Sequence, residues 1–247
     1  MPNSINDVIA VQPSVPLVTG HGQDGEAVVH HAPLDFSDRF ALGFTRLLRI
    51  CADTFFAKRY GHRAIVLETV AAVPGMVGAT IQHLTSLRRM VDDDGWIRTL
   101  MEEAENERMH LMTFIEIAKP TLFERVFVML AQWIFYIGFF ILYLFSSKTA
   151  HRVVGYFEEE AVISYKLYLQ EIDEGRSPNV AAPYIATHYW KLPADATLRD
   201  VVLRVRADEA HHRDINHGFA NKLSGLPVEQ AAMAPYPQHA DQIRMKA

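Results

Sequence analysis

The sequence predicts an all-α fold, and two observations support this class. Apolar residues recur with helical periodicity over most of residues 34–223, whereas the alternation typical of strands is almost absent. The 247-residue chain is 49% hydrophobic, which is sufficient for one domain with a large core. We expect this helical domain to lie between an extended arm at residues 1–33 and a loose tail at residues 224–247.

The first three helices are expected at residues 36–58, 63–89 and 96–119. The first has an amphipathic pattern in which arginines are interspersed with phenylalanines. The second is expected to bend at Pro74-Gly75, because proline lacks the backbone donor that a helix interior uses, and the sequence "VDDDG" ends it. Pro120 ends the third helix.

Three further helices complete the domain. The fourth runs through an uncharged apolar segment to Phe145. The fifth spans residues 149–174, and Gly175 follows it as a stop signal. After a proline-containing connection, Thr197 and Asp200 have the spacing of a capping box that begins the sixth helix, which reaches about Leu223.

Composition excludes several classes of protein. The net charge of −5 argues against nucleic acid as a main partner. A single cysteine, Cys51, excludes an intramolecular disulfide framework and a cysteine-rich metal site. The N-terminal residues do not form a recognisable targeting segment, so we expect synthesis and residence in the cytoplasm.

Two pairs of residues share the spacing Glu-x-x-His. Glu107 and His110 lie in "NERMH" on the expected third helix, and Glu209 and His212 lie in "DEAHH" on the sixth. Side chains three positions apart project from one face of a helix, so each pair can approach the same point. His211 is offset by one position and points elsewhere, which makes His212 the better ligand.

Two single glutamates complete a pattern on the second and fifth helices. Glu68 lies in the apolar segment "AIVLETVAAVPG", where a buried carboxylate is costly unless it is paired or bound to a metal. In "YFEEEAVISY", Glu158 shares the least polar face, although such a triplet is more often solvated. The resulting order is that of ferritin-like four-helix bundles that hold two non-haem irons. Carboxylates bridge two metals and imidazole suits iron, so two Fe ions are the expected cofactor.

The apolar segment at residues 126–145 admits two interpretations. Twenty residues without a charge span about 30 Å as a helix, which is enough to cross a bilayer. Against a span, Gln132 lies inside the segment and its aromatic residues are spread along it. With the amphipathic first helix, the segment would instead form a platform in the membrane interface.

Four segments resemble the signature segments of the alternative oxidases, which are membrane-bound non-haem di-iron ubiquinol oxidases. They are "LETVAAVPGM", "NERMHLMTF", "EEEAVISY" and "RADEAHHRDINH", and the resemblance covers about residues 35–223. It implies a four-helix di-iron bundle, a homodimer, and two helices that lie in one leaflet without crossing it. It also implies ubiquinol and O₂ as substrates, membrane lipid as a partner, and the cytoplasmic face of a bacterial inner membrane or the mitochondrial matrix face.

The resemblance also implies roles for individual residues. The implied metal ligands are Glu68, Glu107, His110, Glu158, Glu209 and His212, and Tyr165 is the implied catalytic residue near the irons. Arg63, Leu67, Glu160, Ala161, Ser164 and Tyr165 are implied to bind the quinol, and Asn106, Asp208, Tyr189 and Trp190 to surround the ligands. Asn106 and Asp208 also directly precede the two Glu-x-x-His pairs, where they can hydrogen-bond the ligating histidines. Ser164 departs from the threonine that is common in the family.

The expected activity is cyanide-insensitive oxidation of ubiquinol with reduction of O₂ to water. Three alternatives stay open at this point. One is a di-iron hydroxylase acting on a quinone precursor or another membrane-bound di-iron oxygenase, and a second is a ferritin-like iron-binding protein without turnover. The third is a structural membrane-anchored bundle in which the six ligands occur by chance.

Overall fold

The computed structural model describes residues 29–56, 60–226 and 233–235, and this part of the chain is mostly helical. The prediction of an all-α fold is therefore confirmed. In chain order the elements are β1 Val29–His31, α1 Phe36–Phe56, α2 Tyr60–Arg89, α3 Trp96–Ala118, α4 Leu122–Phe145, α5 Ser147–Asp173, α6 Tyr184–Tyr189, α7 Leu198–Leu223 and β2 Met233–Pro235.

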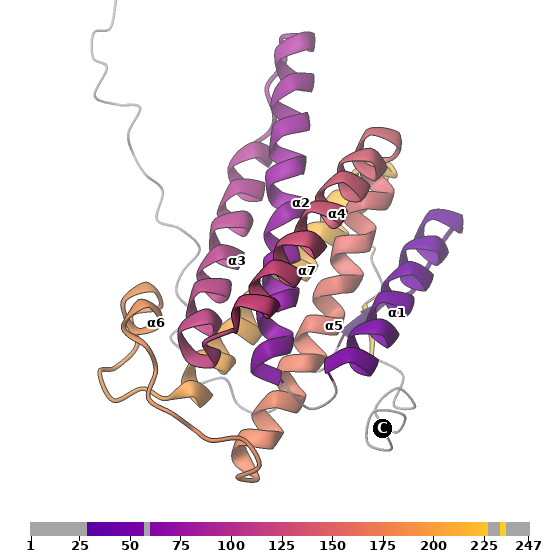
Figure 1. Cartoon of the computed structure of the whole chain (residues 1–247). Coiled ribbons are helices and arrows are strands. Elements are labelled where there is room, and N and C mark those ends of the chain that lie inside the picture. Colours follow the sequence, from indigo (N-terminus) through magenta and orange to yellow (C-terminus); the bar gives the residue numbers. More distant parts are fainter. Residues whose placement is uncertain (1–28, 57–59, 227–232, 236–247) are drawn as a thin grey trace, which may run out of the picture.

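The helices α2, α3, α5 and α7 form a bundle (Figure 1). The pairs α2–α3 and α5–α7 pack along much of their length. Outside this bundle, α4 crosses α2 and continues against α5, and α1 packs beside α5. The four helices that carry the expected ligands are thus the ones that surround the centre of the domain.

The helix boundaries agree with the predicted ones to within a few residues. The expected end of the first helix, at residue 58, lies outside the described residues. α2 begins at Tyr60, three residues earlier than expected. α5 begins at Ser147, because the side chain of Ser146 accepts a hydrogen bond from the Thr149 N–H and caps the helix. At α7 the Thr197 N–H donates to Asp200 Oδ2 at 2.8 Å, as the capping box predicts.

Close packing of α2 against α3 depends on Gly75. The α2 helix continues through Pro74, and the next residue faces α3. A Cβ added at Gly75 would lie 2.3 Å from the carbonyl oxygen of Leu100, so any side chain there would force the helices apart. This contact sets the distance between the helices that carry Glu68 and Glu107.

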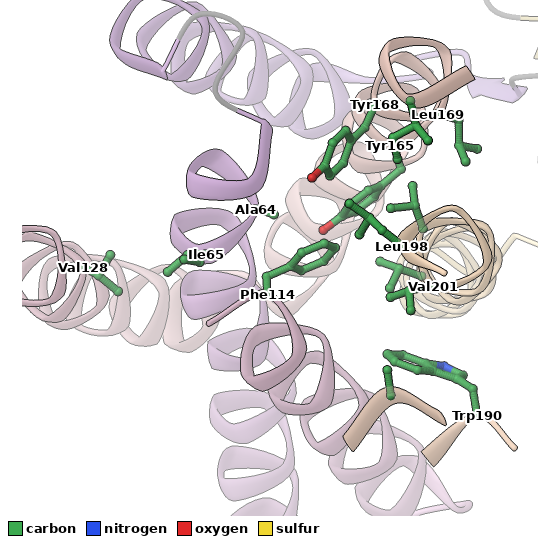
Figure 2. Packing of buried hydrophobic residues seen from close by; sticks show 14 residues of the cluster. Ala64, Ile65, Phe114, Val128, Tyr165, Tyr168, Leu169, Trp190, Leu198 and Val201 are labelled. Atoms are coloured by element: carbon green, nitrogen blue, oxygen red, sulfur yellow. The ribbon is translucent and has the colours of Figure 1, made fainter. Parts of the chain in front are cut away.

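The principal hydrophobic cluster lies among α2, α3, α5, α6 and α7, and Val128 of α4 also belongs to it (Figure 2). Phe114 and Tyr165 are at its centre, with ring centroids 5.7 Å apart. Trp190, which directly follows α6, also belongs to this cluster. Burial of aromatic side chains on this scale contributes most of the free energy that holds such a bundle together.

Two features of the structure were not predicted. The short helix α6 forms within the proline-containing connection, where local pattern is too brief to indicate it. Residues 29–31 and 233–235 pair as antiparallel strands, with His30 opposite Ala234. Part of the segment expected to be a loose tail is therefore ordered by pairing with the N-terminal arm. The division into arm, domain and tail otherwise stays a prediction.

The α4 helix exposes a long apolar surface. Both α2 and α4 are long and apolar enough to cross a membrane, but 61% of the apolar window of α2 is buried within the protein and only 17% of that of α4. α2 is therefore a core helix. On α4, Trp133 and Ile134 are 65% and 74% exposed, and Phe36 on α1 is 81% exposed. Exposed apolar surface of this extent is typical of an interaction site.

Candidate metal centre

The structure brings all six predicted ligands together in the middle of the bundle. Each lies on one of the four bundle helices, and all are buried, with at most 4% of their surface exposed. They form two groups whose nitrogen and oxygen atoms lie within 4.8 Å of one another, and both groups include Glu107 and Glu209. The first group is Glu68, Glu107, His110 and Glu209, and the second is Glu107, Glu158, Glu209 and His212.

Each histidine faces the glutamates of both Glu-x-x-His pairs. His110 Nδ1 lies 3.4 Å from Glu107 on its own helix and 3.2 Å from Glu209 on the other. His212 Nδ1 lies 2.6 Å from Glu107 and 4.0 Å from Glu209. Glu107 and Glu209 are therefore central to the cluster, where each can reach both groups.

Several polar atoms of the cluster are buried without a well-aligned hydrogen bond among the described residues. Both carboxylate oxygens of Glu107, Glu209 Oε1 and His212 Nδ1 are of this kind, although the histidine nitrogens lie within ion-pairing distance of the carboxylates. Such groups are costly to bury unless a ligand satisfies them, and lone pairs that converge on one point suit a cation. Oxygen and imidazole donors in this ratio fit iron, so the residues present fit a two-iron centre.

The pKa values of the cluster also fit a site for cations. Burial, together with the charges of Glu209 and Glu107, raises the pKa of Glu68 well above its ordinary value. Burial and the charge of Glu209 likewise raise the pKa of Glu158. Burial opposes charge on His212, but its close contact with the Glu107 carboxylate outweighs this and raises its pKa to about 9. Without metal, protons therefore take up the positions in which cations would neutralise the carboxylates.

Asp208 holds the first histidine from behind. Its Oδ2 atom accepts hydrogen bonds from His110 Nε2 at 3.2 Å, from Trp190 Nε1 at 2.8 Å and from Asn106 Nδ2 at 3.1 Å. The Asn106 amide also lies 3.0 Å from the Tyr189 hydroxyl. Since Nε2 is engaged by Asp208, the Nδ1 atom of His110 is directed into the cluster. The four residues expected to surround the ligands thus form one network.

Tyr165 contacts the cluster directly. Its hydroxyl donates a short hydrogen bond to Glu68 Oε1, and its ring packs on Phe114. Burial and the charge of Glu68 raise the pKa of Tyr165 well above its ordinary value, so the hydroxyl keeps its proton. A buried tyrosine that shares a proton with a carboxylate of the cluster can supply a proton and an electron to a reaction there.

The residues expected to bind the quinol fall into a charged group and a less polar group. Arg63 pairs with Asp53, Asp53 also pairs with Arg49, and Arg49 Nη1 lies 3.2 Å from Glu160. Arg63 and Glu160 are thus connected through two residues of α1 that the sequence did not single out. Ser164 is buried, and Leu67 and Ala161 are partly buried.

Glu159 occupies a second buried polar site behind the cluster. Its carboxylate accepts a hydrogen bond from the His31 N–H at 2.7 Å, and it lies 2.5 Å from His30 Nδ1 and 3.0 Å from His217 Nε2. The glutamate triplet is therefore not a solvated face, since Glu158 and Glu159 are both buried and Glu160 is partly buried. His211 is exposed, as its offset from His212 predicts.

Glu103 is a buried acid that the sequence did not indicate, because it lies in the acidic run "EEAENE". It precedes Glu107 by one helical turn, so it shares the face of α3 that points into the bundle. Burial raises the pKa of Glu103 to about 7. Its position four residues before a ligand is the signal in the sequence that could have identified it.

Comparison with known proteins gives a consistent result. Residues 20–221 match the family described as Alternative oxidase. Ubiquinol oxidase 2, mitochondrial, of Arabidopsis thaliana is 56% identical over 212 residues, which cover 85% of this chain and 60% of that protein. Ubiquinol oxidase, mitochondrial, of Mangifera indica is 57% identical over 211 residues, which cover 85% of this chain and 66% of the relative.

A third relative comes from outside the plants. Ubiquinol oxidase, mitochondrial, of Batrachochytrium dendrobatidis is 57% identical over 197 residues, which cover 80% of this chain and 62% of that protein. The chain thus spans about three fifths of the length of the curated relatives it matches. The match extends over the four helices that carry the buried cluster, and the chain belongs to the alternative oxidase family.

Proposed function

We propose that this protein oxidises ubiquinol and reduces O₂ to water at a non-haem di-iron centre. The observation that carries the proposal is the pair of four-residue groups that share Glu107 and Glu209. Two shared carboxylates are what a two-metal site requires, whereas a single metal would need only one group. The names of the related ubiquinol oxidases support the same substrate.

In this proposal, six side chains of the bundle hold the two irons. Glu68 and His110 would hold one iron and Glu158 and His212 the other, and Glu107 and Glu209, which belong to both groups, would serve both irons. When bound, the irons supply the electron transfer and dioxygen chemistry that side chains alone do not provide. The bundle excludes water from this reaction, because every ligand is buried.

The remaining residues handle protons and the quinol. Tyr165 holds a proton on its hydroxyl next to Glu68 and delivers it as the reaction proceeds. Arg63, Leu67, Glu160, Ala161 and Ser164 bind the quinol head group on the side of α1 and α4. Two ubiquinols each give up two electrons and two protons, and one O₂ takes up all four of each to give two waters.

We also propose that α1 and α4 attach the protein to one leaflet of a membrane. Both α1 and α4 pack against α2 and α5 (Figure 1), and Trp133 and Ile134 of α4 and Phe36 of α1 are exposed, which fits an interfacial platform. A homodimer is proposed with it. The proposed location is the cytoplasmic face of a bacterial inner membrane or the mitochondrial matrix face, and the relatives named above are called mitochondrial.

The decisive experiment is oxygen uptake by the purified protein with a short-chain ubiquinol, with and without cyanide. We expect two quinols consumed per O₂, little inhibition by cyanide because haem is not involved, and loss of activity in Glu107→Ala. Incorporation of oxygen into the quinone product would identify a hydroxylase instead. Iron binding without steady-state quinol oxidation would identify an iron-binding protein. Full activity in Glu107→Ala would show that the cluster is not the active site.

A further inference from the structure

We propose that Tyr143, His151 and Asn216 form a positioning chain that holds Glu103 beside the His212 half of the metal centre. This inference rests on the proposed di-iron site, and none of the four residues was expected to have a role. Each comes from a different helix: Tyr143 from α4, His151 from α5, Asn216 from α7 and Glu103 from α3.

Asn216 is the junction of the chain. It is fully buried, and its Nδ2 atom lies 3.1 Å and 2.9 Å from the two carboxylate oxygens of Glu103. The same atom lies 3.0 Å from the carbonyl oxygen of His212, one turn earlier in α7. One amide group therefore fixes both the position of Glu103 and the turn of α7 that carries a proposed ligand. Among the described residues, it is the only donor to this carboxylate.

The hydrogen bonds of the chain run in one direction. Because the Asn216 amide nitrogen donates to Glu103, its Oδ1 faces His151 Nδ1 at 2.9 Å, and that nitrogen must carry the hydrogen. Burial lowers the pKa of His151 to about 4, so the ring is neutral and its Nε2 accepts. The Tyr143 hydroxyl, 2.9 Å away, therefore donates to Nε2. The orientation of the Asn216 amide thus fixes the tautomer of His151, and this tautomer fixes the direction of the Tyr143 hydrogen bond.

The two ligand histidines are supported in different ways. The ring of His110 of α3 contacts Asp208, a carboxylate of α7. For His212 of α7 the contact is made by the backbone carbonyl, which accepts from Asn216, and Asn216 connects this turn of α7 to Glu103, a buried carboxylate of α3. Each of the two helices thus supplies an acid that supports the ring or the helical turn of the ligand histidine on the other. Outer carboxylates and their hydrogen-bond partners orient the ligands of metal sites.

The chain begins on the helix with the exposed apolar face. Tyr143 is buried near the end of α4 and is 4% exposed, while its neighbour Leu144 is 60% exposed. The position of α4 against the bundle therefore determines where the Tyr143 hydroxyl lies, and the hydrogen bonds that follow determine where Glu103 lies. We expect loss of this hydroxyl to displace Glu103, although the two residues are separated by the contacts of α5 and α7.

The test is the affinity of the detergent-solubilised full chain for Fe²⁺ in Tyr143→Phe, measured anaerobically by chelator competition. We expect affinity to fall by about 3- to 10-fold, the effect of one buried hydrogen bond. The matched control is Tyr136→Phe, which removes a hydroxyl from the same helix at a residue outside the chain, and we expect it to bind iron like the wild type. Equal affinity of Tyr143→Phe and wild type would overturn the proposal.

A double-mutant cycle separates positioning from general loosening. Asn216→Ala is expected to weaken iron binding by about 10- to 100-fold. In the double variant, Tyr143→Phe should add little, because the chain is already broken; additive effects would contradict the chain. If Asn216→Ala does not fold, Glu103→Gln takes its place in the same cycle.

A spectroscopic measurement completes the test. At saturating iron, Tyr143→Phe should change the paramagnetic resonance signal of the mixed-valence cluster while far-ultraviolet circular dichroism stays unchanged. An unaltered signal would show that the chain is structural only. Because these measurements need no quinol, they separate the two proposals. If Tyr143→Phe alters iron binding but the wild-type protein does not oxidise quinol, the hydrogen-bonded chain stands and the proposed function is rejected.

Discussion

The Nδ1 atom of His212 lies closer to Glu107 of α3 than to Glu209 of its own helix, at 2.6 Å and 4.0 Å. The Glu-x-x-His spacing therefore does not form a self-contained pair. Each pair contributes a carboxylate to the centre and a histidine to one side, and the two sides are completed by Glu68 and Glu158. In the metal-free cluster, protons neutralise the carboxylates that iron would otherwise neutralise.

Iron affinity should rise with pH. The raised pKa of His212, about 9, means that iron must displace a proton from this ring at neutral pH. Between pH 6.5 and 8.5 the apparent affinity for Fe²⁺ should increase by about 10-fold per pH unit for each proton displaced. In the metal-free protein the same raised pKa stabilises the fold below about pH 6.5, and this stabilisation is lost as the pH rises through about 9.

Chelator competition at several pH values measures the first effect, and urea unfolding of the apoprotein measures the second. His188→Asn is the control, because His188 of α6 is exposed and lies outside the cluster. It should leave both pH profiles unchanged. A pH-independent iron affinity in the wild type would contradict the predicted protonation.

Asp208→Asn should weaken iron binding by about 10- to 100-fold. One oxygen of the carboxylate accepts hydrogen bonds from His110, Trp190 and Asn106. An amide lacks the negative charge that strengthens these bonds. If its nitrogen takes this position, it also presents a donor to three donors. Iron content after dialysis against a chelator measures the effect. Asp214→Asn is the matched control, since this aspartate pairs with Arg213 and its side chain is 52% exposed.

Tyr165→Phe should lower quinol oxidation by roughly 10²-fold while the iron content stays at the wild-type level. The variant keeps the ring that packs on Phe114 and loses only the hydroxyl that donates to Glu68. Tyr168→Phe, a change in the same hydrophobic cluster, should retain activity. Wild-type turnover in Tyr165→Phe would show that this hydroxyl takes no part in the reaction.

Gly75→Ala should destabilise the protein by about 1–3 kcal/mol, because the new methyl group would collide with the carbonyl of Leu100. Gly138→Ala is a control of the same kind, since nothing lies within 4 Å of its added Cβ. It should be neutral or stabilise by about 0.5–1 kcal/mol, as expected for a helix interior. Thermal unfolding in detergent compares the two, and equal effects would show that α2 and α3 do not depend on this contact.

Ile134→Glu should reduce binding to lipid vesicles by about 10-fold or more, because it places a charge on the apolar face of α4. Val180→Glu changes an exposed residue between α5 and α6, and should bind vesicles like the wild type. Flotation on a density gradient measures the bound fraction. Equal binding by wild type and Ile134→Glu would locate the membrane contact elsewhere.

Much of the site could be predicted from the sequence because its residues conflict with their surroundings. Glu68 was identifiable as a charge within an apolar segment, and the two Glu-x-x-His pairs by their spacing. Glu103 and Glu159 could not be found in this way, because each lies among other acids and resembles part of a solvated face. Only the packing of α7 and of residues 29–31 shows that they are buried.

The same reasoning explains which parts of the fold were predicted. Long periodic helices and the capping box at Thr197 follow from local pattern, which a short sequence window contains. The helix α6 is too short to show a period, and the β1–β2 pair joins residues about 200 positions apart. Pairing over such a separation depends on the completed bundle and cannot be inferred from either segment alone.

The pairing of β1 with β2 has a practical consequence for rearranging the gene. Val29 faces Pro235 across the two strands, so the ends of the described fold are neighbours. A short linker could join them and allow new termini to be opened at the exposed turn after α5, around Gly175. A circular permutant made in this way would keep all four bundle helices continuous. Its new termini would lie at the turn that follows α5.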